Sequence, residues 1–304
     1  MKIVFMGTPD YATRILKELV SSNIEVSLLV TQPDKPVGRK QILTPPHVKR
    51  WVKKEGLSID IYQPKSLRND EAREKISSYN PDFIVVAAYG QILPIGILDI
   101  APCINLHASI LPNYRGASPI QTSILNGDKF TGVTAMLMEK GLDSGDMLAF
   151  RYTRIDDKRV DELFDELSIA AAKLIPKVLK NFAEIKPVKQ MNADATHCVK
   201  IKKENGLFSF EESAKEIYTK YRAYTPWPGI FLQNGLKIKE LELVDDSKIH
   251  EKSGIVQEIT KEHIVVTCRA GSLKITRVQA PSKKEIGVVE YARGKRIEVG
   301  SSLV

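Results

Sequence analysis

Apolar runs of strand length alternate with helical segments through the first half of this chain. The opening run KIVFMG and the later runs IEVSLLV and FIVVAAYG are apolar at almost every position, which is typical of strands buried on both faces. Amphipathic segments such as HVKRWVKKEG and NDEAREKISSY lie between them. This alternation predicts a Rossmann-like α/β domain, with a mostly parallel sheet covered by helices on both faces.

A turn at Gly7 separates the first strand from the first helix. Thr8 and Pro9 come directly before the apolar positions that repeat with helical spacing. A threonine in this place often accepts a hydrogen bond from the first turn of a helix, and proline is favoured at the first helical position. We therefore expect Thr8 to be the N-cap.

The pattern changes after Pro187. Residues 189–205 have no clear periodicity and are predicted to be a linker. One helical segment follows, and then short alternating runs from GIFLQ to SLKITRV are separated by turn residues. These runs predict a small OB-like antiparallel β-barrel. We expect an N-terminal catalytic domain at 1–188 and a C-terminal domain at 206–304.

Composition narrows the classes of protein that the chain can be. No apolar run approaches the roughly 18 residues that suggest a membrane span, and the first ten residues indicate a strand and turn rather than a signal peptide. The cysteines Cys103, Cys198 and Cys268 form no C-x-x-C pair, which favours the reducing cytoplasm. A monomer is the default expectation for the assembly.

Familiar cofactor and metal signatures are missing. Neither G-x-G-x-x-G nor G-x-x-x-x-G-K-[ST] occurs, and the five histidines lack H-x-x-x-H spacing, so we expect no metal. The formal net charge of +8 suits a polyanionic partner, because Lys and Arg displace counterions from phosphates. With these signatures missing, acid–base and electrostatic catalysis are the kinds of chemistry that remain for the chain.

Two segments carry polar residues suited to that chemistry. In the run INLH, Asn105 and His107 alternate along a predicted strand and therefore share one face. A later strand ends in the turn GLDSG, whose flanking glycines present Asp143. A carboxylate brought to His107 would orient the imidazole and stabilise its charged form. Taken singly, His107 has the alternative interpretation of a core residue whose ring is hydrogen-bonded, and Asp143 that of an ordinary turn residue.

These segments resemble the folate-dependent formyltransferase family, whose hallmark is an Asn-x-His strand, an S-L-L-P loop and an L-D-x-G turn. Here the three elements are NLH at 105–107, SILP at 109–112 and LDSG at 142–145. The similarity extends along the chain through GTPDYA, TQPDKPVGRK, AAYGQILP, YRGASPIQ and YTPWPG. It is closest to the members of the family that act on methionyl-tRNA.

The resemblance implies that the donor is 10-formyltetrahydrofolate and that the acceptor is the α-amino group of methionine on initiator tRNA, for translation initiation. It assigns catalysis to Asn105 and His107 as donors to the oxyanion, and to Asp143 as the residue that polarises His107 and relays a proton through water. It requires no metal.

The resemblance also implies two binding regions. The folate would lie against the loop after the Asn-x-His strand and against AAYGQILP, and the residues are Ser109, Ile110, Leu111, Pro112, Tyr89, Gly90 and Ile92. The tRNA would meet a basic loop and the approach to the β domain, and the residues are Arg39, Lys40, Lys35, Lys200, Lys202 and Lys203. The chain departs from the family pattern with Ile110 for Leu, Asn113 for Arg, and Lys40-Gln41-Ile42 for Gly-Lys-Lys.

Three alternatives stay open at this point. A formyltransferase acting on a small amine, or a formyltetrahydrofolate hydrolase, would use the same three catalytic residues, but neither has an evident use for a basic β domain. A non-catalytic RNA-binding protein on the same fold would not need Asn105, His107 and Asp143 together.

Overall fold

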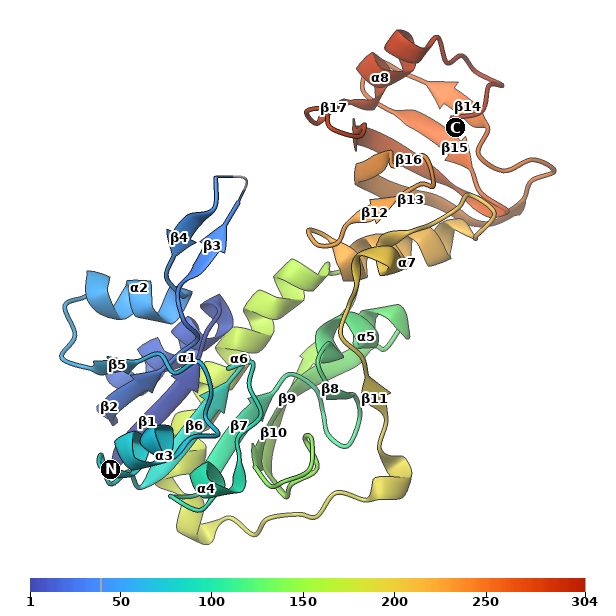
Figure 1. Ribbon diagram of the computed structural model, residues 1–304. Coiled ribbons are helices and arrows are strands. Elements are labelled where there is room, and N and C mark those ends of the chain that lie inside the picture. Colours follow the sequence, from blue (N-terminus) through green and yellow to red (C-terminus); the bar gives the residue numbers. More distant parts are fainter. Residues whose placement is uncertain (39, 304) are drawn as a thin grey trace. The chain divides into compact units, whose positions relative to one another are not determined.

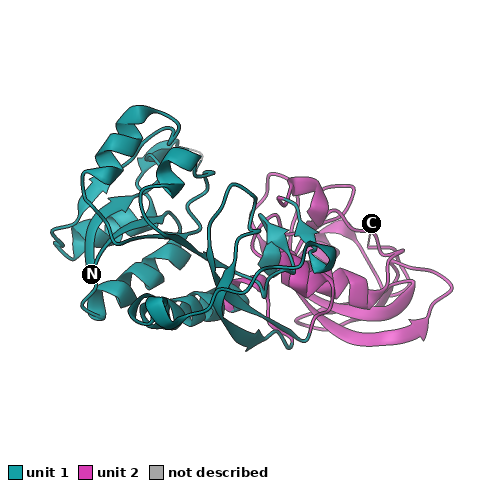
Figure 2. Cartoon of the chain, turned by 90° about the horizontal axis from the view of Figure 1, so that it is seen from below, with its two compact units in different colours: residues 1–120, 129–156, 163–199 teal, residues 121–128, 157–162, 200–304 magenta. Residues whose placement is uncertain are grey.

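The computed structural model describes residues 1–38 and 40–303 of the chain (Figure 1). By their internal contacts, these residues form two compact units, which Figure 2 colours separately. The first unit contains residues 1–38, 40–120, 129–156 and 163–199, and the second contains residues 121–128, 157–162 and 200–303. The predicted domain limits at 188/189 and 205/206 stay a prediction.

A sheet of seven strands organises the first unit, in the order β10-β9-β7-β6-β1-β2-β5. The five strands from β7 to β5 in this order run parallel, whereas β9 and β10 run antiparallel to their neighbours. The bounds are β1 Lys2–Gly7, β2 Glu25–Val30, β5 Asp60–Tyr62, β6 Phe83–Ala87, β7 Cys103–His107, β9 Phe130–Leu137 and β10 Met147–Arg154. The chain first adds β2 and β5 on one side of β1 and then adds β6 and β7 on its other side. The boundary between β1 and β6 is therefore a topological switch point, where open α/β sheets usually bind ligands.

Helices cover both faces of this sheet. On one face, Ala72 and Ile76 of α3 and Ile97 of α4 pack against inward residues of the parallel strands. The other face carries α1, whose Tyr11 contacts Phe164 of α6 with the ring centroids 5.4 Å apart. The bounds are α1 Asp10–Ser21, α2 His47–Lys54, α3 Asp70–Ser77, α4 Ile95–Leu98, α5 Pro119–Leu125 and α6 Val160–Lys180. The predicted α/β architecture is confirmed.

The prediction that Thr8 caps the first helix was wrong. Helix α1 begins at Asp10 with Pro9 as its N-cap residue, and no side chain caps it. The Thr8 hydroxyl donates instead to the carbonyl of Tyr89 at 3.0 Å, and the Gln32 side-chain amide donates to the same oxygen at 3.2 Å. These bonds tie together the loops that follow β1, β2 and β6. The Thr8 hydroxyl therefore donates to a carbonyl of a distant loop instead of accepting from the first turn of α1.

The second unit contains an antiparallel sheet, as predicted. Its strands follow the order β12-β13-β16-β15-β14, an open path among the described residues, and β17 pairs with β16. Helix α7 begins with a capping box, in which Ser213 and Glu216 exchange side-chain and backbone hydrogen bonds. The bounds are α7 Ala214–Tyr224, β12 Ile230–Phe231, β13 Lys237–Ile249, β14 Val256–Ile259, β15 Ile264–Thr267, β16 Ala270–Gln279, β17 Ile286–Gly287 and α8 Val288–Lys295.

Short elements complete the two units. Two paired strands form a hairpin after β2, and two more pair in parallel across a long sequence separation. The bounds are β3 Lys35–Val37, β4 Ile42–Thr44, β8 Arg115–Gly116 and β11 His197–Cys198, with 3-10 turns at Phe182–Glu184, Asn192–Asp194 and Lys203–Gly206. Among the described residues, no helix combines the length and apolarity needed to cross a membrane.

Candidate active site

Strand β7 places Asn105 and His107 on one face of the sheet. In the register, Asn105 pairs with Met136 and His107 with Thr134, both on β9. Alternate residues of a strand point the same way, so the two polar side chains are neighbours. The His107 side chain is only 6% exposed, which means that its ring must find hydrogen-bond partners inside the protein.

The turn after β9 folds back and brings Asp143 to these two residues. Its Oδ1 atom lies 3.3 Å from Asn105 Nδ2, which donates to it, and 3.7 Å from His107 Nδ1. Its Oδ2 atom accepts a hydrogen bond from the backbone N–H of Gly116 at 2.9 Å. The three residues predicted from the sequence therefore form one cluster.

The backbone carbonyl of Tyr114 occupies the other side of the histidine ring. It lies 2.9 Å from His107 Nε2. Because a carbonyl oxygen can only accept, a hydrogen bond here requires that Nε2 carries a proton. The imidazole is thus held between a carbonyl and a carboxylate, and this fixes the orientation of the ring.

The chain after α6 supports the cluster, although its aperiodic sequence predicted only a linker. β11 pairs in parallel with β8, and Thr196 accepts from the backbone N–H of Arg115 at 2.9 Å. Gln190 donates to the backbone of the Asp143 turn and accepts from the Arg115 guanidinium. Sequence reasoning missed Gln190, because nothing in the sequence marks an isolated glutamine in an irregular segment. Arg115 lies within the YRGASPIQ similarity, which was a usable signal.

The predicted folate loop lies directly on β9. Thr134 connects them, since its hydroxyl donates to the carbonyl of Ser109 at 2.7 Å and accepts from the N–H of Leu111 at 3.1 Å. Ile110 packs over Gly132, where an added Cβ would lie 2.4 Å from the Ile110 Cδ1 atom. The Ser109 hydroxyl donates to the carbonyl of Asn113, so it is already engaged within the loop. Leu111 is buried and precedes Pro112.

The loop after β6 contains the other predicted folate residues. Tyr89 is 2% exposed, and burial raises the pKa of its hydroxyl. Gly90 has φ +87° and Ile92 is 73% exposed. Because β6 and β7 are adjacent and parallel, their two following loops leave the same edge of the sheet. A planar ligand between these loops would meet backbone groups and the exposed Ile92 side chain.

The predicted tRNA residues lie in two places. Lys35 and Lys40 are exposed on and beside the β3–β4 hairpin, whereas Arg39 lies outside the described residues. In the second unit, the exposed residues are Lys200, Lys202 and Lys203.

The stretch from Lys35 to Lys54 contains seven Lys and Arg residues and no Asp or Glu, yet one of its lysines has a partner inside the protein. Lys49 contacts Asp34 at 2.8 Å and donates to the Gln63 side chain at 2.6 Å. Hydrogen bonds from Gln63 and Lys49 hold the pKa of the Asp34 carboxyl below its usual value. Lys49 therefore anchors the base of the hairpin, and its charge is already compensated.

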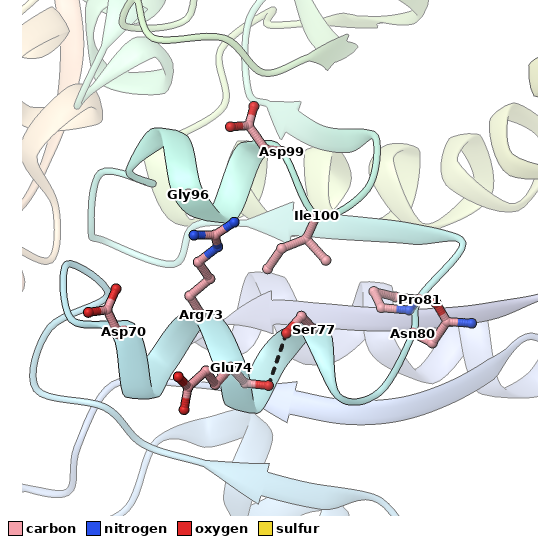
Figure 3. A pocket seen from close by; sticks show the side chains of 9 residues that line it. All are labelled: Asp70, Arg73, Glu74, Ser77, Asn80, Pro81, Gly96, Asp99 and Ile100. Atoms are coloured by element: carbon pink, nitrogen blue, oxygen red, sulfur yellow. Dashed lines mark hydrogen bonds between the residues drawn. The ribbon is translucent and has the colours of Figure 1, made fainter.

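A hollow of about 410 Å³ lies elsewhere in the first unit (Figure 3). α3 and α4 line it together with Pro81 and Ile100, which precede β6 and β7. It therefore opens at the amino ends of these strands, away from His107 at the carboxyl end of β7. Its charged side chains, Asp70, Arg73, Glu74 and Asp99, are exposed. We do not assign the chemistry to this hollow.

No group of three or more His, Cys, Asp or Glu side chains that could hold a metal ion occurs in the part of the chain that the structure describes.

Residues 1–179 match the family model described as "Formyl transferase", and residues 200–296 match "Formyl transferase, C-terminal domain". The methionyl-tRNA formyltransferase of Nitratiruptor sp. is 55% identical over 305 residues, covering 99% of each chain. That of Campylobacter lari is 52% identical over 301 residues, with the same coverage.

Two solved structures share the fold at low sequence identity. HypX from Aquifex aeolicus in complex with tetrahydrofolic acid has a TM-score of 0.70 and 18% identity, covering 98% of this chain and 48% of that one. WlaRD, a sugar 3N-formyl transferase, has a TM-score of 0.66 and 18% identity, covering 93% and 99%.

Proposed function

The chain belongs to the formyl transferase family, and from that premise we propose that it transfers the formyl group of 10-formyltetrahydrofolate to the α-amino group of methionine on initiator tRNA. Its relatives of 50–55% identity are named methionyl-tRNA formyltransferase and match it over nearly their whole length. The observation that carries the proposal is the convergence of Asn105, His107 and Asp143 on one face of the sheet.

Asn105 and His107 stabilise the charge that develops during attack. When the amine attacks the formyl carbon, the formyl oxygen becomes an oxyanion, and preorganised N–H donors lower the barrier. Asn105 uses one of its two N–H groups on Asp143 and keeps the second for this oxygen. The Nε2 proton of His107 bonds to the Tyr114 carbonyl, so the substrate oxygen must share that proton or replace the carbonyl.

Asp143 provides the negative charge of the cluster. Its carboxylate faces His107 Nδ1 and stabilises positive charge on the ring. It also accepts, through water, the proton that the amine loses as the new C–N bond forms. The bond from the formyl carbon to the folate nitrogen then breaks, and that nitrogen takes up a proton.

The binding regions complete the proposal. The folate lies against the 109–112 loop and residues Tyr89, Gly90 and Ile92, where apolar and backbone groups suit a flat ring. The tRNA phosphates bind the exposed lysines on the β3–β4 hairpin and those at 200–203, together with Arg39, and these contacts position the tRNA without reading its sequence.

The test supplies labelled formyl-tetrahydrofolate with methionine-charged initiator tRNA, and elongator methionyl-tRNA as the control substrate. Label is expected in initiator tRNA. His107→Ala should abolish the transfer, and Arg39→Ala should weaken it. His263→Ala is the matched control, since His263 bonds to Thr260 in a turn of the second unit.

A different product would overturn the proposal. If label appeared only as formate, the chain would be a formyltetrahydrofolate hydrolase. If only a small amine were formylated, the acceptor would not be tRNA.

A further inference from the structure

Gln190 uses its whole side-chain amide to join the two loops of the candidate active site. Its Nε2 donates to the carbonyls of Asp143 at 2.9 Å and Gly145 at 2.7 Å. Its Oε1 accepts from Arg115 Nε at 2.9 Å. The side chain thus contacts Asp143 through the backbone, while the Asp143 carboxylate stays directed at the catalytic cluster.

Arg115 determines which way the Gln190 amide faces. A guanidinium can only donate, so the amide oxygen must point to Arg115 and the amide nitrogen must point to the turn. Arg115 is only 5% exposed, and its Nη1 atom donates to Asn192 Oδ1 at 3.0 Å. Within residues 1–38 and 40–303, no carboxylate forms an ion pair with Arg115. Neutral amides therefore hold this buried cation.

The backbone on either side of Arg115 also contacts the catalytic residues. The carbonyl of Tyr114 binds His107, and the N–H of Gly116 donates to Asp143. Fixing the position of Arg115 therefore also fixes the Tyr114–His107 and Gly116–Asp143 hydrogen bonds.

The Asp143 turn needs an external support. Asp143 has φ +50°, in the left-handed region that few non-glycine residues adopt, although aspartate adopts it more often than most. Such a conformation persists when the surroundings hold it. The two hydrogen bonds from Gln190 hold the carbonyls of Asp143 and Gly145, one on each side of Ser144.

We propose that Gln190 is a positioning residue for Asp143, with Arg115 orienting its amide. The inference rests on the proposed function, because it assigns Gln190 to the same reaction. Without the two hydrogen bonds, the turn can relax and the carboxylate moves away from Asn105 and His107. A displacement of about 1 Å at such a site can lower the rate by about 100-fold.

The experiment measures kcat and KM for methionyl-tRNA in three variants. Gln190→Met has similar length but no hydrogen bonds, and we expect its kcat to fall by roughly 10- to 100-fold with KM within about twofold. Gln190→Glu keeps an acceptor for Arg115 but directs an oxygen at the two carbonyls, so we expect a similar fall. Gln279→Met, the matched control, makes the same replacement at a partly exposed glutamine of the second unit that donates to the carbonyl of Lys283, and its kcat should stay within about threefold of wild type.

A double-mutant cycle separates positioning from general support. If Gln190 acts through Asp143, then adding Gln190→Met to Asp143→Asn should lower kcat by less than about threefold further. An additive effect would overturn the proposal, as would wild-type kcat in Gln190→Glu.

Hydrogen exchange at residues 141–146 gives a readout that does not depend on the substrate. We expect faster exchange in Gln190→Met than in the wild type or Gln279→Met, and unchanged exchange would overturn the inference. If the wild type failed to formylate methionyl-tRNA, the proposed function would be lost, while the exchange result would still decide the role of Gln190 in the turn.

Discussion

Replacing Asp143 with asparagine removes the negative charge of the cluster with little change in shape. The Asp143 side chain is 12% exposed, and its Oδ1 lies 3.7 Å from His107 Nδ1. Two unit charges about 4 Å apart interact by about 4 kcal/mol at an effective dielectric constant of about 20. Each step of about 1.4 kcal/mol in the barrier is a factor of ten in rate. In the proposed mechanism the His107 ring gains positive charge in the transition state, so Asp143→Asn should lower kcat by about 1,000-fold.

The hydrogen bonds of the asparagine variant point the same way. The Gly116 N–H needs an acceptor, so the Asn amide oxygen takes the place of Oδ2. The amide nitrogen then faces Asn105 Nδ2, which is also a donor. The variant thus loses the favourable contact with Asn105 as well as the charge near His107.

Single-turnover formyl transfer to methionyl-tRNA is the appropriate assay, because it measures the chemical step without product release. Asp146→Asn is the matched control in the same turn and should transfer at close to the wild-type rate. Thermal melting of both variants checks that they are folded. A rate for folded Asp143→Asn within about tenfold of wild type would refute the electrostatic reasoning.

Three further predictions concern the backbone beside Asp143, the base of the β3–β4 hairpin and the proposed tRNA-binding lysines. Gly116→Ala should lower the melting temperature by roughly 2–10 °C, because Gly116 has φ +124° and a Cβ would lie 2.2 Å from the Cys198 carbonyl oxygen; an unchanged melting curve would contradict this. Lys49→Met should destabilise the protein by about 1 kcal/mol near neutral pH. The pKa of Asp34 is lowered in the folded state, so this difference should shrink as pH falls below the ordinary value of 3.8, and denaturant titrations that show a constant difference would count against it. Replacing Lys200, Lys202 and Lys203 together with alanine should raise KM for the tRNA, leave kcat unchanged and make the affinity for tRNA less dependent on salt concentration. A salt dependence equal to that of the wild type would show that these three lysines do not bind the tRNA.

The local sequence pattern correctly predicted the strands and helices whose hydrophobic periodicity is visible in the sequence. The alternation of apolar strands with helices predicted the parallel sheet, because strands buried on both faces must be apolar throughout. Period-two alternation placed Asn105 and His107 on one face, and β7 does place them there. Asp143 was selected from its glycine-flanked turn and from family resemblance, and its carboxylate contacts both residues.

Predictions about individual hydrogen-bond partners succeeded less well. Thr8 has the expected identity for an N-cap, yet its hydroxyl bonds to a residue of a distant loop. No acidic residue lies between Lys35 and Lys54 in the sequence, but Asp34 and Gln63 lie beside Lys49 in the fold. A polar side chain bonds to the nearest partner in space, and the sequence shows only the partners nearest along the chain.

The sequence by itself determined the order of elements, the face of β7 that carries the polar pair and, through its motifs, the family. Only the tertiary structure decided how the Asp143 turn is held, because Gln190 bonds to the turn, and Arg115 bonds to Gln190, across long stretches of chain. Hydrophobic periodicity is a local property that repeats many times and can be read from a single sequence. A hydrogen bond between distant loops occurs once, and it depends on a geometry that exists only after the sheet has formed.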